Sequence, residues 1–276
     1  YDEGSFRPYA EDDINKLIQV IKYYLININP WVRVQRCIRD IPGCSIEAGY
    51  QKKSNLRQMI QQEIDSNNEQ TFEIRNMEVR ESKYLNYPAR LVVRKYEASG
   101  GMEYHLSMEA YEDDNFSKIK YYLYCIYANL MYMFSFDEKK YWSGSKNYVA
   151  LFGFLRLRLD NNPGGDIIPE INNSALIREV HVYGNSLGVG SDNLSSQHRG
   201  YGQYLMNVAE QIAIDNDWGK TSVISGVGTR EYYKNKCGYH LEGTYMIKKL
   251  NDNRPTKVMI NFSILVLAVS SLYFLF

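Results

Sequence analysis

The stretch 175–248 constrains the fold most, because candidate strands and helices alternate along it. We expect strands at 175–183, 220–225 and 239–248, and helices at 201–216 and 230–236. A glycine-containing loop precedes the first helix and a glycine turn precedes the second. A strand–helix–strand order brings two strands side by side in parallel. The pattern therefore predicts an α+β fold with a mixed sheet.

The residues before this stretch predict helices and then an antiparallel meander. Apolar residues at three- and four-residue spacing behind an acidic start predict a helix at 11–28, which Pro30 ends. An alternating segment at 31–40 predicts a strand, and a short helix capped by Ser54 follows. Alternation with period two predicts the meander strands at 71–79, 89–97, 102–110 and 148–159. We interpret 113–146, which is rich in Tyr, Lys and Asn, as an insertion.

Composition excludes several classes of protein. Lys and Arg together number 32, as do Asp and Glu, so the overall charge demands no polyanionic partner and any RNA contact must be local. The four cysteines, Cys37, Cys44, Cys125 and Cys237, form no C-x-x-C pair and have no His at ligand spacing. This argues against a zinc site or a disulfide framework and favours a reducing compartment.

The C-terminal segment 258–276 contains no charged residue. As a helix with about 1.5 Å rise per residue it would match the ~30 Å hydrocarbon thickness of a bilayer. We expect a transmembrane tail anchor on the cytoplasmic face of the mitochondrial outer membrane or the endoplasmic reticulum. Arg254 and Lys257 would stay on the cytoplasmic side. The alternative is a buried terminal helix or strand.

A glycine pattern precedes the helix at 201–216. Gln197, Gly200 and Gly202 form a Q-x-x-G-x-G sequence where a loop becomes a helix. Unpaired backbone N–H groups and the positive dipole end at a helix N-terminus bind phosphate, and glycines allow a close approach. The segment thus predicts an anion cradle, although a glycine pair before a helix is more often only a tight turn.

These residues resemble a known family. Four segments are similar to the catalytic-subunit family of the Elongator complex. They are the Q-x-x-G-x-G turn, the preceding 178–184 (REVHVYG), the later 225–230 (SGVGTR) leading into Tyr232 and Tyr233, and the upstream 31–34 (WVRV). The resemblance extends to about Leu250 and implies a GNAT (acyl-CoA N-acyltransferase) fold. It implies a linker helix region that ends an upstream radical-SAM-type domain at 1–65, the acetyltransferase domain at 66–250, and the transmembrane tail at 258–276.

In that family, a radical S-adenosylmethionine domain with an iron–sulfur cluster works with the acyltransferase domain to carboxymethylate wobble uridines of tRNA. This chain lacks a cluster-binding cysteine motif. The resemblance therefore implies acetyl-CoA as the cofactor here, with the cluster and S-adenosylmethionine only in an upstream domain absent from this chain. The implied partners are tRNA and other Elongator-type subunits, with the membrane reached through the tail and a protein lysine as a further possible substrate.

The resemblance also implies site residues. Glu179, Val180, His181 and Val182 would line the pantetheine arm along a strand edge, where backbone groups can pair with cofactor amides. Tyr201, Gly202, Gln203 and Tyr204 would hold the pyrophosphate, with Gln197 and Gly200 shaping the turn. Tyr233 would reach the thioester sulfur, since a phenol with a pKa of about 10 can protonate a leaving thiolate.

Each of these roles has an ordinary structural alternative. Tyr232 and Tyr233 can pack on the sheet, and Glu179 or His181 can be a salt-bridged surface residue instead of a catalytic base. Arg33, Arg36 and Arg39 beside Trp31 suggest a strip for tRNA phosphates, but arginines in a strand are more often ordinary surface.

Three functions follow as hypotheses. The first is an acetyl-CoA-dependent module of an Elongator-type tRNA-modifying enzyme, in which tRNA triggers thioester cleavage. The second is a stand-alone GNAT that acetylates a protein lysine. The third is a membrane-tethered scaffold that holds acetyl-CoA without turnover.

Overall fold

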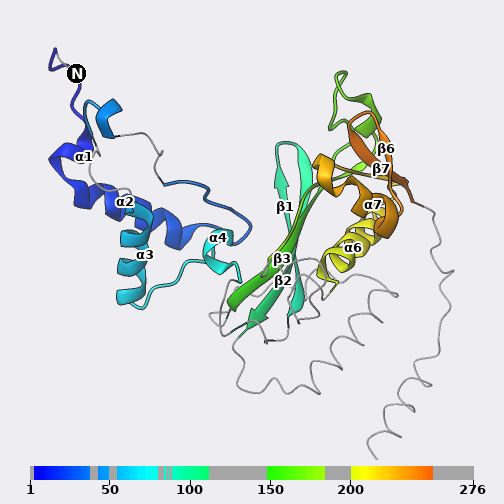
Figure 1. Ribbon diagram of the computed structural model, residues 1–276, viewed down its shortest axis with the longest axis horizontal. Coiled ribbons are helices and arrows are strands. Elements are labelled where there is room, and N and C mark those ends of the chain that lie inside the picture. Colours follow the sequence, from blue (N-terminus) through cyan, green and yellow to red (C-terminus); the bar gives the residue numbers. More distant parts are fainter. Residues whose placement is uncertain are drawn as a thin grey trace, which may run out of the picture.

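A computed structural model describes residues 3–37, 43–49, 55–79, 84, 87, 89–111, 148–183 and 200–250. The helices are α1 (Tyr9–Asp12), α2 (Ile14–Asn27), α3 (Leu56–Ser66), α4 (Ile74–Met77), α6 (Tyr201–Asp215) and α7 (Arg230–Cys237). The strands are β1 (Arg90–Ala98), β2 (Gly101–Tyr111), β3 (Tyr148–Leu159), β4 (Ala175–Val182), β5 (Lys220–Val223), β6 (His240–Glu242) and β7 (Tyr245–Lys249). The 3-10 turns are η1 (Gly43–Ser45), η4 (Pro169–Ile171) and η6 (Val227–Thr229). Figure 1 shows α1 to α4 grouped beside a sheet that carries α6 and α7 on one face.

The strands form one seven-stranded sheet in the order β1-β2-β3-β4-β5-β7-β6. Neighbouring strands from β1 to β4 are antiparallel, and β4 and β5 are parallel from Ala175 opposite Thr221 to Ile177 opposite Val223. The helix α6 connects β4 to β5, so the predicted strand–helix–strand unit is confirmed. The parallel pairing of β4 with β5 is short, and β4 continues beyond the end of that pairing.

The two faces of the sheet differ in chemistry. Leu106 of β2 and Leu155 of β3 are fully buried in one cluster with Leu205 of α6. Burying a leucine side chain contributes about 1.5–3 kcal/mol, so this packing holds α6 on the sheet. The opposite face bears polar residues, among them Arg156 of β3 and Glu179 of β4, which lie directly across from each other.

The N-terminal helices have a core of their own. Ile18 and Leu25 of α2 pack with Leu56, Ile60 and Ile64 of α3. The helix predicted at 11–28 is confirmed as α2. Its N-cap is Asp13, whose side chain accepts hydrogen bonds from the backbone N–H groups of the next turn.

Three predictions about individual elements are wrong. The predicted strand at 71–79 contains the helical turn α4, because the Glu73 side chain caps that turn by accepting the Arg75 backbone N–H. The predicted strand at 239–248 is the pair β6 and β7, which reverses at Gly243 with φ of 56°. The segment 31–37, predicted as part of a strand, belongs to no strand of the sheet.

The predicted fold class also needs correction. For residues 1–65 we expected a linker helix region that ends an upstream radical-SAM-type domain, and α2 and α3 enclose an apolar core of their own there. Within the ranges given above, no helix combines the length and the apolarity that a bilayer crossing requires. The expected transmembrane helix at 258–276, the insertion at 113–146 and Ser54 lie outside the described residues.

Candidate functional site

The free edge of β4 is the first part of the site. Only 175–177 of β4 pair with β5, so the backbone of 178–182 has no partner strand on that side among the described residues. The predicted pantetheine residues Glu179, Val180, His181 and Val182 all lie on this edge. An extended ligand with amide groups can hydrogen-bond to such an edge as an added strand would.

The N-terminus of α6 is the second part. Gly200 is the N-cap, with φ of 75°, and the helix start has no side-chain cap. A Cβ added to Gly202 would lie 3.2 Å from the Tyr232 hydroxyl and 3.5 Å from Val182 Cγ2. Gly202 therefore lies where β4, α6 and α7 come together. Any side chain at position 202 would fill the space between them. This close approach fits the predicted pyrophosphate cradle.

The other cradle residues have different surroundings. Tyr201 is buried and packs edge-on against Phe152, so its ring supports the core. Gln203 donates a hydrogen bond to the Lys236 carbonyl at 3.2 Å, which connects α6 to α7. Tyr204 is partly buried against the same core. Gln197 lies outside the described residues.

The two tyrosines of α7 are placed differently from each other. Tyr233 is 7% exposed and its ring lies edge-on to Tyr239 at 6.2 Å. Tyr232 is 38% exposed and its hydroxyl is the group nearest to Gly202. Burial raises the pKa of both phenols, so both remain protonated at neutral pH. Either hydroxyl is thus in the donor form that an acid requires.

The side chains of Glu179 and His181 lie on the polar face of the sheet. Glu179 Oε2 is 3.5 Å from Arg156 Nε, and Arg156 also donates to the Trp31 carbonyl at 3.0 Å. The His181 ring stacks with Phe154 at 6.2 Å and contacts Tyr183 at 4.8 Å. The backbone of Glu179 thus belongs to the free edge, while its carboxylate faces the N-terminal segment.

The sequence prediction missed Arg156. Its signal was present, because Phe154, Arg156 and Arg158 alternate with Leu155 and Leu157 along one strand. That alternation places the arginines on the face opposite the core. The alternation could not show that Arg156 bonds to Trp31, because the two residues are far apart in the sequence.

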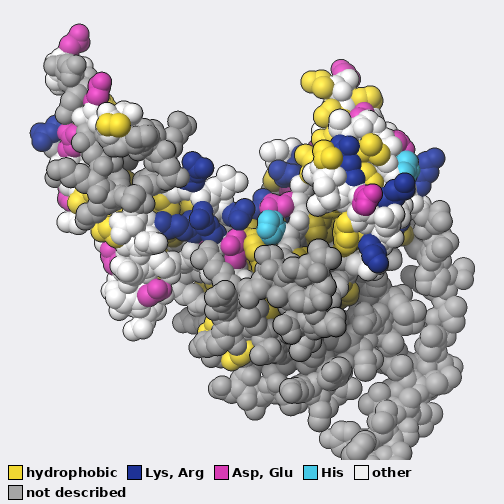
Figure 2. All heavy atoms as spheres, viewed as in Figure 1, with side chains coloured by type: hydrophobic (Ala, Val, Ile, Leu, Met, Phe, Trp, Pro, Cys, Tyr) yellow, Lys and Arg dark blue, Asp and Glu magenta, His cyan; other side chains and the backbone are white. Residues whose placement is uncertain are grey.

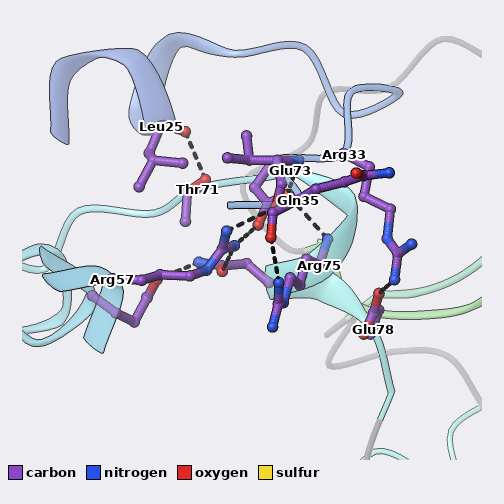
Figure 3. Close-up of polar contacts among 11 residues, drawn as sticks. Leu25, Arg33, Gln35, Arg57, Thr71, Glu73, Arg75 and Glu78 are labelled. Atoms are coloured by element: carbon purple, nitrogen blue, oxygen red, sulfur yellow. Dashed lines mark hydrogen bonds and ion pairs between the residues drawn. The ribbon is translucent and has the colours of Figure 1, made fainter. Parts of the chain in front are cut away.

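A polar cluster, which we call the clamp, holds segment 31–35 between α3 and α4 (Figure 3). The Glu73 carboxylate is fully buried, forms an ion pair with Arg57, and accepts the Val34 N–H at 3.0 Å. Arg57 also donates to the Val34 carbonyl at 2.9 Å, and Arg75 donates to the Gln35 carbonyl at 2.6 Å. The clamp supplies the backbone partners that a neighbouring strand would otherwise provide.

The predicted basic strip is partly neutralised. Arg33 pairs with Glu78 at 3.1 Å, Arg36 also has an interaction partner, and Arg39 lies outside the described residues. Figure 2 shows basic, acidic and histidine side chains together where the N-terminal helices meet the sheet. The junction is therefore of mixed charge. In the described part of the chain, no three His, Cys, Asp or Glu side chains are grouped to hold a metal ion.

Comparison with known proteins gives one family match. Residues 1–66 match the family described as Radical_SAM C-terminal domain. This match corrects the predicted fold class: residues 1–66 are similar to that domain, and the comparisons do not support the predicted GNAT class. It also corrects the cofactor prediction, because part of the radical SAM region lies within this chain and is not confined to an absent upstream domain.

The chain is also similar to longer proteins. It is 33% identical over 259 residues to Elongator complex protein 3 of Mus musculus, with 90% of this chain and 39% of that protein aligned. It is 34% identical over 258 residues to the tRNA uridine(34) acetyltransferase of Methanocaldococcus infernus, covering 90% of this chain and 40% of that protein. The solved structure of the archaeal Methanocaldococcus infernus Elp3 with an N-terminal deletion superposes with a TM-score of 0.62 at 32% identity, over 90% of this chain and 51% of that one. The chain thus spans about two fifths of the curated relatives, and its similarity is to an Elp3-type protein.

Proposed function

We propose that this chain is the acetyl-CoA-dependent acyltransferase part of an Elongator-type enzyme that modifies tRNA uridines. The observation that carries the proposal is the convergence of the free β4 edge, the N-terminus of α6 and Gly202 at one place. Similarity to a tRNA uridine(34) acetyltransferase supports the reaction class. When bound, acetyl-CoA would supply an acetyl group activated as a thioester.

Different residues of the chain would bind different parts of acetyl-CoA. Backbone groups of 179–182 would hydrogen-bond to the pantetheine arm along β4. Backbone N–H groups of Tyr201, Gly202 and Gln203 in the first turn of α6 would hold the pyrophosphate, and Gly202 keeps that approach open. The Tyr204 N–H donates to the Gly200 carbonyl at 3.0 Å, so Tyr204 would contribute only its side chain. Gly200 takes the left-handed conformation that starts the turn.

Tyr233 is the residue we propose for protonating the leaving thiolate. Its phenol remains protonated because burial raises its pKa, and general acid catalysis of this kind contributes about 10²- to 10⁴-fold. Glu179 and His181 are proposed as groups that position water or accept a proton. Other Elongator-type subunits and tRNA are the partners that this function requires.

The test is acetyl-CoA consumption by the full chain, followed as free thiol with and without bulk tRNA. We expect tRNA to stimulate thiol release, and Gly202→Glu to abolish it by filling the cradle. Gly219→Ala is the matched control, because a Cβ there meets nothing within 4 Å. Acetyl-CoA binding without a tRNA response would favour a protein lysine acetyltransferase, and an absence of binding would contradict both functions.

A further inference from the structure

A β-bulge marks the point at which β4 leaves β5. Arg156 of β3 lies opposite Glu179, whereas the next residue, Leu157, lies opposite Ile177, so Arg178 is an extra residue in β4. The pairing of β4 with β5 ends at the same place, because Ile177 is the last residue of β4 in that register. A bulge bends a strand and increases its twist. The free edge of β4 therefore begins at the bulge.

The bulge also decides which side chains of the free edge face α6. Alternation from the buried Ile177 without an extra residue would place 180 and 182 on the polar face of the sheet. The structure has the reverse arrangement, because Val180 and Val182 pack against the core cluster that includes α6. Val182 Cγ2 is thereby 3.5 Å from the position of a Cβ at Gly202. The bulge thus brings the free edge to the predicted cradle.

Two ion pairs hold the bulge on the polar face of the sheet. Arg178 Nη1 is 2.8 Å from Oε1 of Glu103, a side chain of β2 that is 1% exposed. Glu179 Oε2 is 3.5 Å from Nε of Arg156 in β3. Both residues of the bulge are therefore tied by charge to neighbouring strands.

Arg156 also contacts the N-terminal region. Its Nη2 donates a hydrogen bond to the Trp31 carbonyl at 3.0 Å. Its guanidinium carbon lies 5.4 Å from the centre of the Phe154 ring, and Phe154 stacks with His181 at 6.2 Å. One side chain therefore connects segment 31–35 to Glu179 directly and to His181 through one ring.

The space around Arg156 is incompletely filled. A cavity of about 300 Å³ lies there between segment 31–35 and the sheet. It is lined by Trp31, Val32, Arg33, Gln35, Tyr96, Arg156 and Glu179. Close packing resists small displacements, and a cavity removes that resistance on one side of the ion pair. Movement of segment 31–35 can thus reach β4 through Arg156 without disturbing the apolar core.

We propose that Arg156 is a positioning residue that acts through Glu179: it holds the free edge of β4 in the conformation that binds the pantetheine arm, and it links that conformation to the placement of segment 31–35. This inference deepens the proposed function and rests on it for acetyl-CoA as the ligand. Displacement of the segment would release Arg156 from Trp31 and weaken acetyl-CoA binding. Because coupling between two sites is reciprocal, bound acetyl-CoA would in turn hold the segment in place.

Isothermal titration calorimetry of the full chain with acetyl-CoA tests the proposal. We expect Arg156→Gln to raise Kd about 10-fold with unchanged stoichiometry, because a misaligned edge loses roughly one hydrogen bond to the ligand. A substitution that only destabilised the fold would lower the number of binding sites and leave Kd unchanged. Lys16→Gln, at a side chain that is 82% exposed, is the control for loss of a positive charge.

A double variant shows whether Arg156 acts through Glu179. The effects of Arg156→Gln and Glu179→Gln on Kd should not add, so the double variant should bind acetyl-CoA as the weaker single variant does. Additive effects, or an unchanged Kd in Arg156→Gln, overturn the proposal.

Amide hydrogen exchange separates this proposal from the proposed function. The Tyr183 N–H donates to the Phe152 carbonyl at 2.8 Å and reports on the pairing of β3 with the end of β4. We expect the amides of 178–183 to exchange about 10-fold faster in Arg156→Gln, with exchange in α6 unchanged. Acetyl-CoA should also slow exchange of the Val34 amide in the unmodified chain and not in Arg156→Gln.

The two measurements together distinguish the outcomes. Faster exchange at 178–183 in a chain that binds no acetyl-CoA would support the role of Arg156 in positioning the edge and refute only the cofactor. Unchanged exchange there would refute the role of Arg156 even where acetyl-CoA binds. A Val34 amide that acetyl-CoA does not protect, in a chain that binds it, would refute the link to segment 31–35.

Discussion

Glu73, the N-cap residue of α4, forms an ion pair with Arg57 of α3, and the carboxylate of this pair has no exposed surface. The pair fixes α3 against α4 and, through Val34, fixes the segment that reaches the sheet. It is the centre of the clamp in Figure 3. Polar contacts of Val34 and Trp31 therefore hold this segment between the N-terminal helices and the sheet.

Glu73→Ala should lower the free energy of unfolding by about 3 kcal/mol, because it removes the carboxylate that pairs with the Arg57 guanidinium and leaves the Val34 N–H without its acceptor. Chemical denaturation measures this change. Lys16→Gln removes an exposed ion-pair partner and should change stability by less than about 0.5 kcal/mol. Equal changes in the free energy of unfolding for the two substitutions would show that the clamp contributes little to stability.

His105 should make the fold sensitive to acid. Its side chain is 1% exposed, and its pKa lies well below the ordinary 6.5, mainly because of burial and further because of Arg94 and Arg156. Below about pH 6.5 the unfolded chain binds a proton at this residue that the folded chain does not. Stability therefore falls as pH decreases, by about 1.4 kcal/mol per pH unit from this residue while only the unfolded form is protonated.

His105→Phe tests this linkage, because phenylalanine can retain the ring contact with Phe154. We expect the stability of the variant relative to the unmodified protein to rise between pH 6.5 and pH 5. Denaturation midpoints across this range measure the difference, and the carboxylates contribute equally to both proteins. Parallel stability curves would contradict a neutral buried His105.

Gly164→Ala should destabilise the loop before β4. A Cβ at Gly164 would overlap the Ile168 carbonyl oxygen and lie 2.7 Å from Ile171 Cγ1, so the backbone must shift. We expect a loss of about 2 kcal/mol, measured by thermal or chemical unfolding. Gly219→Ala has open space and should change stability by about 0.5 kcal/mol or less.

Tyr233→Phe should lower thiol release from acetyl-CoA about 100-fold with the affinity for acetyl-CoA unchanged, because only the hydroxyl is lost. Turnover and equilibrium binding are measured on the same preparation. Tyr23→Phe, at a side chain that is 71% exposed on α2, is the matched control. Should Tyr232→Phe abolish turnover while Tyr233→Phe does not, the acid is Tyr232, whose hydroxyl lies beside Gly202.

The sequence alone predicted the elements whose signals are local. Apolar spacing and an acidic start identified α2, and the alternation in 148–159 gave the bounds of β3. The glycine pattern at Gly200 and Gly202 identified the start of α6. These signals depend on neighbours within a few residues, which the sequence records directly.

Only the tertiary structure decided what the extended and polar residues contact. Alternation predicted a strand at 31–40, but the backbone of 34–35 bonds to the side chains of Arg57, Glu73 and Arg75 and pairs with no strand of the sheet. Arg33, Arg156 and Glu179 come together because the sheet register places Arg156 opposite Glu179 and the clamp brings Arg33 to the same cavity. The physical reason is that backbone periodicity is local, whereas the partners of a buried charge are set by the packing of segments distant in sequence.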